Sequence, residues 1–429
     1  MARTVLQVIS CVWYGLLVSG AVLADDASTF ESDPPQETVP LTLDQLEDLA
    51  LQRHPTLAVA SRRIEALQGA YVQAGLYPNP MIGYHGEEIG DEGRAGQQGI
   101  VVAQRIVTAG KLGWNRKVVA QEIAAAQQHW QMQRYRVISD VRVAAHEVIA
   151  AQRTVELSER LVQLGTDFQQ TAQRLFEALE VSRRDVLQAS IEASAAELRL
   201  QRARQTLDGR WKQLAAHIGM ADLPLMPIED VWDQDDAAPL DWDETLQRVL
   251  QESPEWLQAS VEIERARADV SRQFANTRPD VELVGSVSYN DASRDAIAGI
   301  GVSIPLQLFD RNQGNILRAR AELQAAYEEL HRVELMLQRR LAAVFQEYEN
   351  AFVTVGRYQD EILPTASEAL ELVGQGYQQG EVEYLELLTV QRTFFQTSLD
   401  FVEAFRDLQV SRTRIANLLL ANALEDPGP

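Results

Sequence analysis

The chain has 429 residues, enough for two or three ordinary domains or for one elongated domain. Acidic residues outnumber basic ones by 62 to 39, and the formal net charge of −23 excludes the basic surface that a nucleic-acid-binding protein needs. Hydrophobic residues make up 46% of the chain, too many for a disordered protein. Outside the N-terminus no run of about 20 apolar residues occurs, so we expect no membrane-spanning helix in the mature chain.

Residues 1–24 have the pattern of a cleavable signal peptide. Arg3 supplies a positive charge, an apolar stretch follows, and Ala24 ends a small-residue cleavage site. An uncleaved membrane anchor is the alternative, which the short apolar core disfavours. Cleavage would remove Cys11, the only cysteine, and with it any disulfide or Cys-ligated metal site. We therefore expect an exported protein whose mature chain begins with a polar tether over residues 25–40.

The rest of the chain contains a duplicated unit. Residues 43–55 match residues 242–254 at an offset of 199, and Val181 matches Val382 at an offset of 201. Such a small drift over half a protein indicates duplication and not chance. The expected organisation is a first repeat over 41–222, an acidic proline-containing linker over 223–240, a second repeat over 241–422 and a tail over 423–429.

Both repeats show the same order of elements. A helical pattern comes first, two strand-like segments follow, and a very long helix then leads through a short break into a last helix. The first repeat places these elements at 42–77, about 80–107, 112–178 and 182–218. The second repeat places them at 241–277, about 280–308, 315–378 and 383–421.

The strand-like segments alternate between apolar and polar residues. On the third segment the apolar side is formed by Val281, Leu283, Val287 and Tyr289. Ser286 and Ser288 lie on the other side. A soluble sheet packed on helices would alternate in the same way, but four such segments in two matched hairpins favour tilted strands that cross an outer membrane. We therefore expect the four apolar residues to face lipid, the two serines to face a lumen, and the intervening loops to face outside.

Apolar stripes along the long helices have coiled-coil spacing. In the second repeat the stripe consists of Leu337, Leu341, Val344, Tyr348, Ala351, Val355, Tyr358 and Ile362. In the first repeat it contains Val141, Val148, Val155 and Val162. A helix over 112–178 would be about 100 Å long at 1.5 Å per residue. The shorter helices could stack end to end beside it, and the resulting four columns are too few to close a wide tube, so we expect several subunits.

No catalytic motif occurs in the sequence. The six histidines include no pair at helical metal-ligand spacing, and HExxH, Walker, GxSxG and dinucleotide-binding patterns are missing. The methionines are scattered and form no soft-metal cluster. We therefore expect no enzyme, no cofactor and no resident metal.

Four sequence strings resemble the TolC-type outer-membrane factors, and most of all their cobalt–zinc–cadmium efflux branch. The strings are Tyr77-Pro78-Asn79-Pro80, Thr108-Ala109-Gly110-Lys111-Leu112, residues 304–316, and Gly376-Tyr377-Gln378-Gln379-Gly380 followed by residues 384–388. They occur in the order typical of the family, and the resemblance covers about residues 41–422.

The resemblance implies a mainly α fold with a small β part. Three copies would form a 12-stranded outer-membrane β-barrel continuous with a long periplasmic α-helical barrel. This passive duct would dock on a periplasmic adaptor (a membrane fusion protein) and an inner-membrane RND-type pump. Heavy-metal cations are the first expected cargo, and drugs or proteins of type I secretion are the alternatives. A periplasmic coiled-coil adaptor is the alternative from another class, which two helical hairpins and few strands disfavour.

The resemblance also implies a gate at the periplasmic tips of the helices. Glu386 lies nine residues after Tyr377, where the family places a carboxylate at the constriction. Asp185 is its counterpart in the first repeat, and Gly380 belongs to the tip turn. Leu179 stands where the family usually has glycine, so we expect the first tip to be tighter or more helical.

Overall fold

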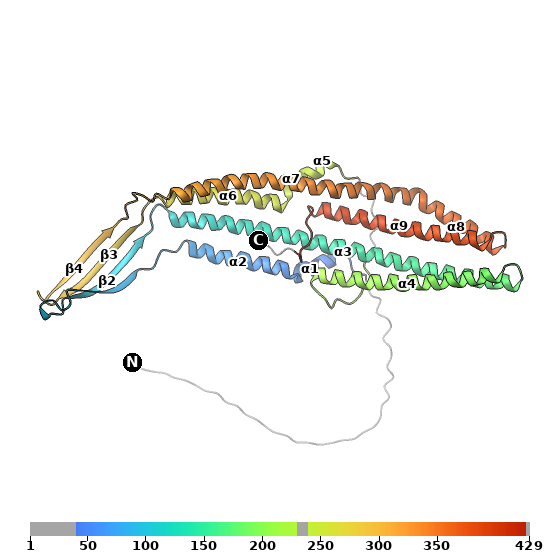
Figure 1. Ribbon diagram of the computed structural model, residues 1–429, viewed down its shortest axis with the longest axis horizontal. Helices are drawn as coiled ribbons and strands as arrows, with labels where there is room; N and C mark the ends of the chain where they lie inside the picture. The colour runs from blue at the N-terminus through green and yellow to red at the C-terminus, as the bar shows by residue number, and fades with distance from the viewer. Residues whose placement is uncertain (1–39, 230–238, 426–429) are drawn as a thin grey trace, which may run out of the picture. The chain divides into compact units, whose positions relative to one another are not determined.

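The computed structural model describes residues 40–229 and 239–425 (Figure 1). The expected signal peptide, the tether up to residue 39, residues 230–238 of the expected linker and the end of the tail lie outside the described residues. Within the described residues the chain is mainly helical with one small sheet, as predicted. The sheet lies at one end of the helices, and the two tight helical turns lie at the other (Figure 1).

Each repeat begins with two helices where the sequence predicted one. They are α1 (Leu43–Arg53) and α2 (Pro55–Ala74) in the first repeat, and α5 (Trp242–Glu252) and α6 (Pro254–Ala275) in the second. The prediction was wrong because a proline disfavours the helical conformation of the residue before it. His54 and Ser253 are accordingly extended, and each following proline occupies the first turn of the next helix.

The long helix of the first repeat is continuous, as predicted. It is α3 (Lys111–Glu177), and α4 (Arg183–Ile218) returns beside it. Helix α2 packs against α3 on the side of the sheet, so two shorter helices lie end to end along one long helix (Figure 1). Among the described residues, no helix has both the length and the apolar character that crossing a bilayer requires.

The corresponding helix of the second repeat is interrupted. Helix α7 (Gln313–Arg357) passes through a π-helical turn, η3 (Tyr358–Ile362), into α8 (Leu363–Gln378). The prediction of one regular helix was wrong here because Pro364 lacks the N–H for an α-helical bond and its ring crowds the preceding turn. A wider π turn accommodates that proline. Helix α9 (Tyr384–Ala416) returns beside α8 and α7 and ends earlier than expected.

The four strands form one antiparallel sheet in the order β1-β2-β3-β4. They are β1 (Met81–Glu87), β2 (Gln97–Ile106), β3 (Val281–Asn290) and β4 (Asp295–Ser303). The central pair joins the two repeats, with Ile100 of β2 opposite Val287 of β3. Strand β4 ends before Pro305, since proline cannot donate to a strand ladder. A 3-10 turn, η1 (Asp91–Gly93), lies in the loop between β1 and β2.

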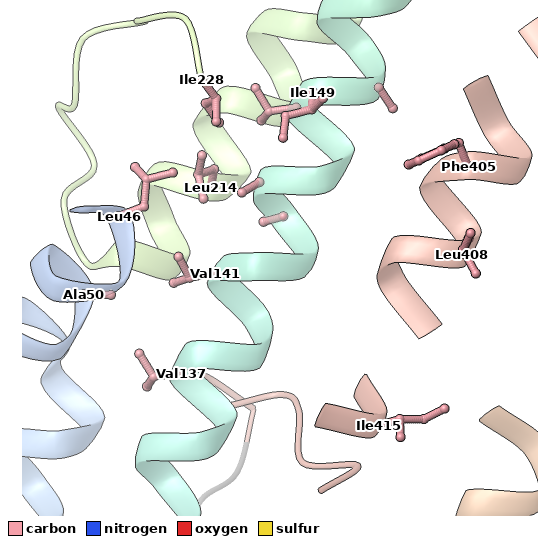
Figure 2. Close-up of a cluster of buried hydrophobic side chains, with 14 of the residues drawn as sticks. Leu46, Ala50, Val137, Val141, Ile149, Leu214, Ile228, Phe405, Leu408 and Ile415 are labelled. Carbon is pink, nitrogen blue, oxygen red and sulfur yellow. The ribbon is translucent and has the colours of Figure 1, made fainter. Parts of the chain in front are cut away.

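The largest core cluster lies where α1, α4 and α9 meet the middle of α3 (Figure 2). In the second repeat the predicted stripe is confirmed as far as Val355 by the burial of Leu337, Leu341, Tyr348, Ala351 and Val355, but Ile362 at its end is 38% exposed. In the first repeat Val141 and Val148 are buried, but the buried line then shifts to Leu161 and Phe168. A straight α-helix rotates by about 20° per seven residues, so a strict seven-residue repeat turns away from the neighbouring helix.

Candidate functional site

One face of the sheet is covered by apolar side chains. The strand register places on it Ile82, Tyr84, Ile100, Val102, Leu283, Val287, Tyr289, Ile300 and Val302. Most of these side chains are exposed in the single chain, and Ile300 is 90% exposed. Val281 lies on the same face by strand alternation, so all four residues predicted to face lipid share it.

The opposite face is mixed. It carries most of the small and polar residues of the central strands, together with Met81, Val101, Val284 and Ile297. Ser286 lies opposite Gly299, and Ser288 lies opposite Gly99. The side-chain amide of Gln97 donates to the hydroxyl of Ser288 at 2.5 Å. A Cβ at Gly99 would overlap the backbone of β3, so glycine is required where the two repeats meet. Ser286 and Ser288 therefore lie on the face opposite the apolar side chains of β3, as the predicted strand phase requires.

Strands β1 and β4 form the edges of the sheet. Neither pairs with a further strand within the part of the chain that the structure describes. An unpaired edge beside an exposed apolar face invites association with other strands. The sheet therefore needs partners for both its edges and its apolar face.

The sheet is joined to the helices by a charged network around Asp280. Lys111 Nζ donates to Asp280 Oδ1 at 2.6 Å, and Arg105 Nη2 donates to Oδ2 at 2.6 Å. The backbone N–H of Thr108 also donates to Oδ1, at 3.1 Å. Burial raises the pKa of Asp280, but Lys111, Thr108 and Arg105 outweigh it and hold that pKa below its usual value. Sequence reasoning missed this network because Asp280 and Lys111 lie 169 residues apart.

The two helical tips have the same backbone hydrogen-bonding pattern. After α3 the N–H of Glu180 donates to the carbonyl of Leu175, and after α8 the N–H of Glu381 donates to the carbonyl of Gly376, both at 2.9 Å. This pairing requires a left-handed residue at the turn. Leu179 supplies it with φ +68° and Gly380 with φ +76°. The expectation of a tighter or more helical first tip was therefore wrong.

The two predicted gate carboxylates have different surroundings. Glu386 is exposed at the first turn of α9. Asp185 accepts hydrogen bonds from the hydroxyl of Ser182 at 2.7 Å and from the Ser182 N–H at 3.0 Å. The hydroxyl bond, partly opposed by burial, lowers the pKa of Asp185. Asp185 thus closes a capping box at the start of α4, a role that Glu386 does not share.

Tyr377 is buried at the tip. Its ring lies edge-on to Phe168 at 6.2 Å between centroids and 5.7 Å from Tyr384. Burial raises the pKa of Tyr377, and the negative charge of Asp185 adds to the shift. The structure therefore gives Tyr377 a packing role that ties α8 to α3 within one chain.

A cavity of about 530 Å³ lies between α3, α4 and α9, on the side of the tip that faces the middle of the helices. Its wall includes Leu161, Phe168 and Phe395, and an ion pair between Arg392 and Glu192 links the two repeats beside it. Among the described residues, no group of three His, Cys, Asp or Glu side chains is arranged to hold a metal ion.

The left-handed conformation of Leu179 leads to a prediction about tip stability. A leucine in this conformation is strained by about 1–2 kcal/mol, and its side chain is 89% exposed. We expect Leu179→Gly to stabilise the first tip by up to about 1 kcal/mol, whereas Gly380→Leu should destabilise the second tip by a similar amount. Hydrogen exchange of the Glu180 and Glu381 amides measures both effects. Unchanged exchange at both amides would contradict the strain argument.

Comparison with known proteins agrees with this architecture. The outer membrane efflux protein family matches residues 46–220 and 245–419, two stretches that lie within the ranges expected for the two repeats. The cobalt-zinc-cadmium resistance protein CzcC of Cupriavidus metallidurans is 27% identical over 391 residues, covering 90% of this chain and 91% of CzcC.

Solved structures show the same fold. The structure of CusC matches with a TM-score of 0.74 at 16% identity, over 90% of this chain and 93% of CusC. The outer-membrane channel OprN matches with a TM-score of 0.72 at 18% identity, over 89% of this chain and 90% of OprN. The chain therefore belongs to the outer membrane efflux protein family.

Proposed function

We propose that the chain is the passive exit duct of a tripartite efflux system, and that three copies close a 12-stranded barrel in the outer membrane. The sheet is the observation that supports this proposal most strongly. One of its faces is apolar and exposed, the other carries glycines and serines among a few apolar residues, and its two edges pair with no further strand of the described residues. In a bilayer an open edge leaves backbone groups without hydrogen-bond partners, so only a closed barrel is stable there. Pairing β4 of each copy with β1 of the next removes every edge.

Closure of the barrel also determines which face of the sheet contacts lipid and which lines the lumen. Val281, Leu283, Val287 and Tyr289 face lipid, while Ser286 and Ser288 face the lumen. The helices continue the duct into the periplasm. A periplasmic adaptor and an inner-membrane RND-type pump are its proposed partners, because a passive tube needs a source of energy and a link to it. Membership of an outer-membrane family counts against the alternative of a periplasmic adaptor.

Heavy-metal cations are the proposed cargo. The support is the identity of 27% with a cobalt-zinc-cadmium resistance protein over nine tenths of both chains. Drugs and secreted proteins are the competing cargo classes. Deletion of the gene followed by growth on graded zinc, cobalt, cadmium and copper separates them. We expect reduced tolerance to at least one metal, restored by the parent gene, while unchanged tolerance to all four would contradict the metal assignment.

Glu386 is the proposed carboxylate of the periplasmic constriction, with Asp185 as its counterpart in the first repeat and with Tyr377 and Gly380 as further residues of the periplasmic tip. Three copies would place three Glu386 side chains about one axis, and a ring of anions favours cations. We expect Glu386→Ala to weaken cation selectivity in planar bilayers and to reduce block by multivalent cations added from the periplasmic side. Glu328→Ala, an exposed acid on α7, should change neither property.

Asp185→Ala separates gating from capping. Loss of the capping box should destabilise the start of α4 by about 1 kcal/mol. The selectivity should change less than in Glu386→Ala. If Glu386→Ala and Glu328→Ala both conduct like the parent, Glu386 does not line the constriction.

A further inference from the structure

The connections at the two edges of the sheet expose apolar side chains. Before β1, Leu76 and Tyr77 are exposed, and after β4 the exposed run consists of Ile304, Leu306, Leu308 and Phe309. Leu306 is 80% and Phe309 91% exposed. The connection after β2 and the connection before β3 differ from these, because the hydrogen bonds and ion pair of Asp280 tie the two together. The exposed run also continues the apolar sheet face directly, since Ile300 and Val302 of β4 precede it.

The same end of the molecule is basic. The segments next to the sheet are residues 71–80, 107–120, 272–280 and 304–320. They contain eight basic and two acidic residues, although acids outnumber bases by 62 to 39 in the whole chain. A concentration of positive charge beside an apolar surface is the pattern of an interfacial membrane contact.

Aromatic rings hold several of these cations in place. The guanidinium carbon of Arg116 lies 5.7 Å from the centroid of the Tyr71 ring, and that of Arg320 lies 5.2 Å from the Phe274 ring. Lys117 Nζ lies 5.0 Å from the Trp114 ring. Arg116 also fills the space beside Gly75, where any Cβ would overlap its guanidinium. These contacts place the three cations next to the apolar connections.

We propose that this junction belt binds phospholipids of the periplasmic leaflet of the outer membrane. The belt is defined by Leu76, Tyr77, Leu306, Leu308, Phe309, Arg116, Lys117 and Arg320. Its apolar side chains enter the acyl region, and its cations bind the lipid phosphates. The inference rests on the proposed function, because a sheet that spans the membrane places its helical junction at this leaflet.

A second copy of the chain is the competing occupant, since barrel closure would bring the connection after β4 near the neighbour's connection before β1. The charge of these segments argues against a second copy as the occupant. The neighbour carries the same eight-to-two excess of basic residues; Asp280 is already paired within its own chain, which leaves Asp310 as the one further acid of these segments to face eight cations. A leaflet of anionic phospholipids supplies an anionic counterpart, at about 1 kcal/mol for each basic side chain near its surface, which is about fivefold in binding.

Site-directed spin labelling tests the location of the belt. Cys11 is the only cysteine, so a Cys11→Ser background carries one label per introduced cysteine. Labels at Phe309→Cys and Leu306→Cys are compared in phosphatidylglycerol-containing vesicles with Val287→Cys on the sheet and Val353→Cys on exposed α7. We expect oxygen to relax the belt labels more than a water-soluble nickel chelate does, as at Val287, with the opposite order at Val353.

The other possible accessibilities of the spin labels would overturn either this inference or the proposed function. Belt labels that respond like Val353 lie in water, and belt labels that neither relaxer reaches lie between copies; both results overturn the inference while leaving the barrel intact. If Val287 itself responds like Val353, the sheet does not span the membrane and the proposed function fails.

Replacement of two cations tests lipid recognition. Arg116→Gln with Arg320→Gln should weaken phosphatidylglycerol binding to the detergent-solubilised protein about 25-fold. Arg199→Gln with Arg202→Gln, two exposed cations on α4, is the matched control and should leave binding unchanged. Equal weakening by both pairs, or complete displacement of the lipid by inorganic phosphate, would overturn the assignment to phospholipid.

Discussion

Val287→Arg is expected to abolish most outer-membrane assembly, whereas Ser286→Arg, one residue away, should assemble nearly like the parent. Val287 lies in a row with Tyr84, Ile100 and Ala298 in the middle of the apolar face. Arginine near the middle of the lipid face of a barrel costs about 2–4 kcal/mol per copy, and three copies multiply the effect. Ser286 lies on the opposite face, where an arginine would meet water if that face lines the proposed lumen.

The yield of heat-resistant trimers in outer-membrane fractions measures this difference. Both variants introduce the same charge, and they differ only in the face of β3 that carries it. Equal assembly of the two variants would show that the strand phase, and with it the lipid-facing surface, is assigned incorrectly. Val287→Ser separates the loss of apolar contact from the added charge and should assemble better than Val287→Arg.

Asp280→Asn is expected to destabilise the junction between sheet and helices by about 3 kcal/mol. The Lys111 side chain is 12% exposed, so removal of its partner leaves a largely buried cation unpaired. Arg105 is mostly exposed and adds little, because solvent screens its pair. Asp208→Asn is the matched control: its pair with Lys212 has the same length, 2.6 Å, but is exposed and should contribute well under about 1 kcal/mol.

The pH dependence of this contribution has a definite sign. The pKa of Asp280 is lower in the folded than in the unfolded chain, so its contribution is fully present above the unfolded pKa of about 3.9. The contribution is lost as the pH falls through the folded pKa. Thermal unfolding of parent and Asp280→Asn should therefore differ at neutral pH and converge in acid. A constant difference down to about pH 2 would contradict the ionised network.

The elements defined by local periodicity could be predicted from the sequence. Helix α3 begins and ends within one residue of the expected bounds, since its apolar spacing and its missing prolines are local features. The strand phase of β3 was predictable for the same reason. The breaks at His54 and Ser253 were missed because a proline in the first turn fits a helical pattern equally well. Their signal was the extended conformation that proline imposes on its predecessor.

The candidate site was only partly predictable. Glu386 lies nine residues after Tyr377 and Asp185 lies nine residues after Phe176, and this equal spacing suggested one role for both carboxylates. Ser182, three residues before Asp185, gave the capping-box signal that separates them. The Asp280 network had no comparable signal, because its cations come from the other repeat and only the folded sheet brings them together.

Disulfide cross-linking along the sheet edges tests barrel closure most directly. Within one chain β1 and β4 are separated by two strands, about 14 Å, which is beyond the reach of a disulfide. Cysteine at Ile82 or Tyr84 of β1 is combined with cysteine at 296, 298, 300 or 302 of β4 in the Cys11→Ser background. Closure by three copies predicts a covalent trimer, and no larger species, for at least one pair in non-reducing gels of outer-membrane fractions. Monomers alone for every pair, or a ladder that extends beyond three copies, would contradict the closed barrel.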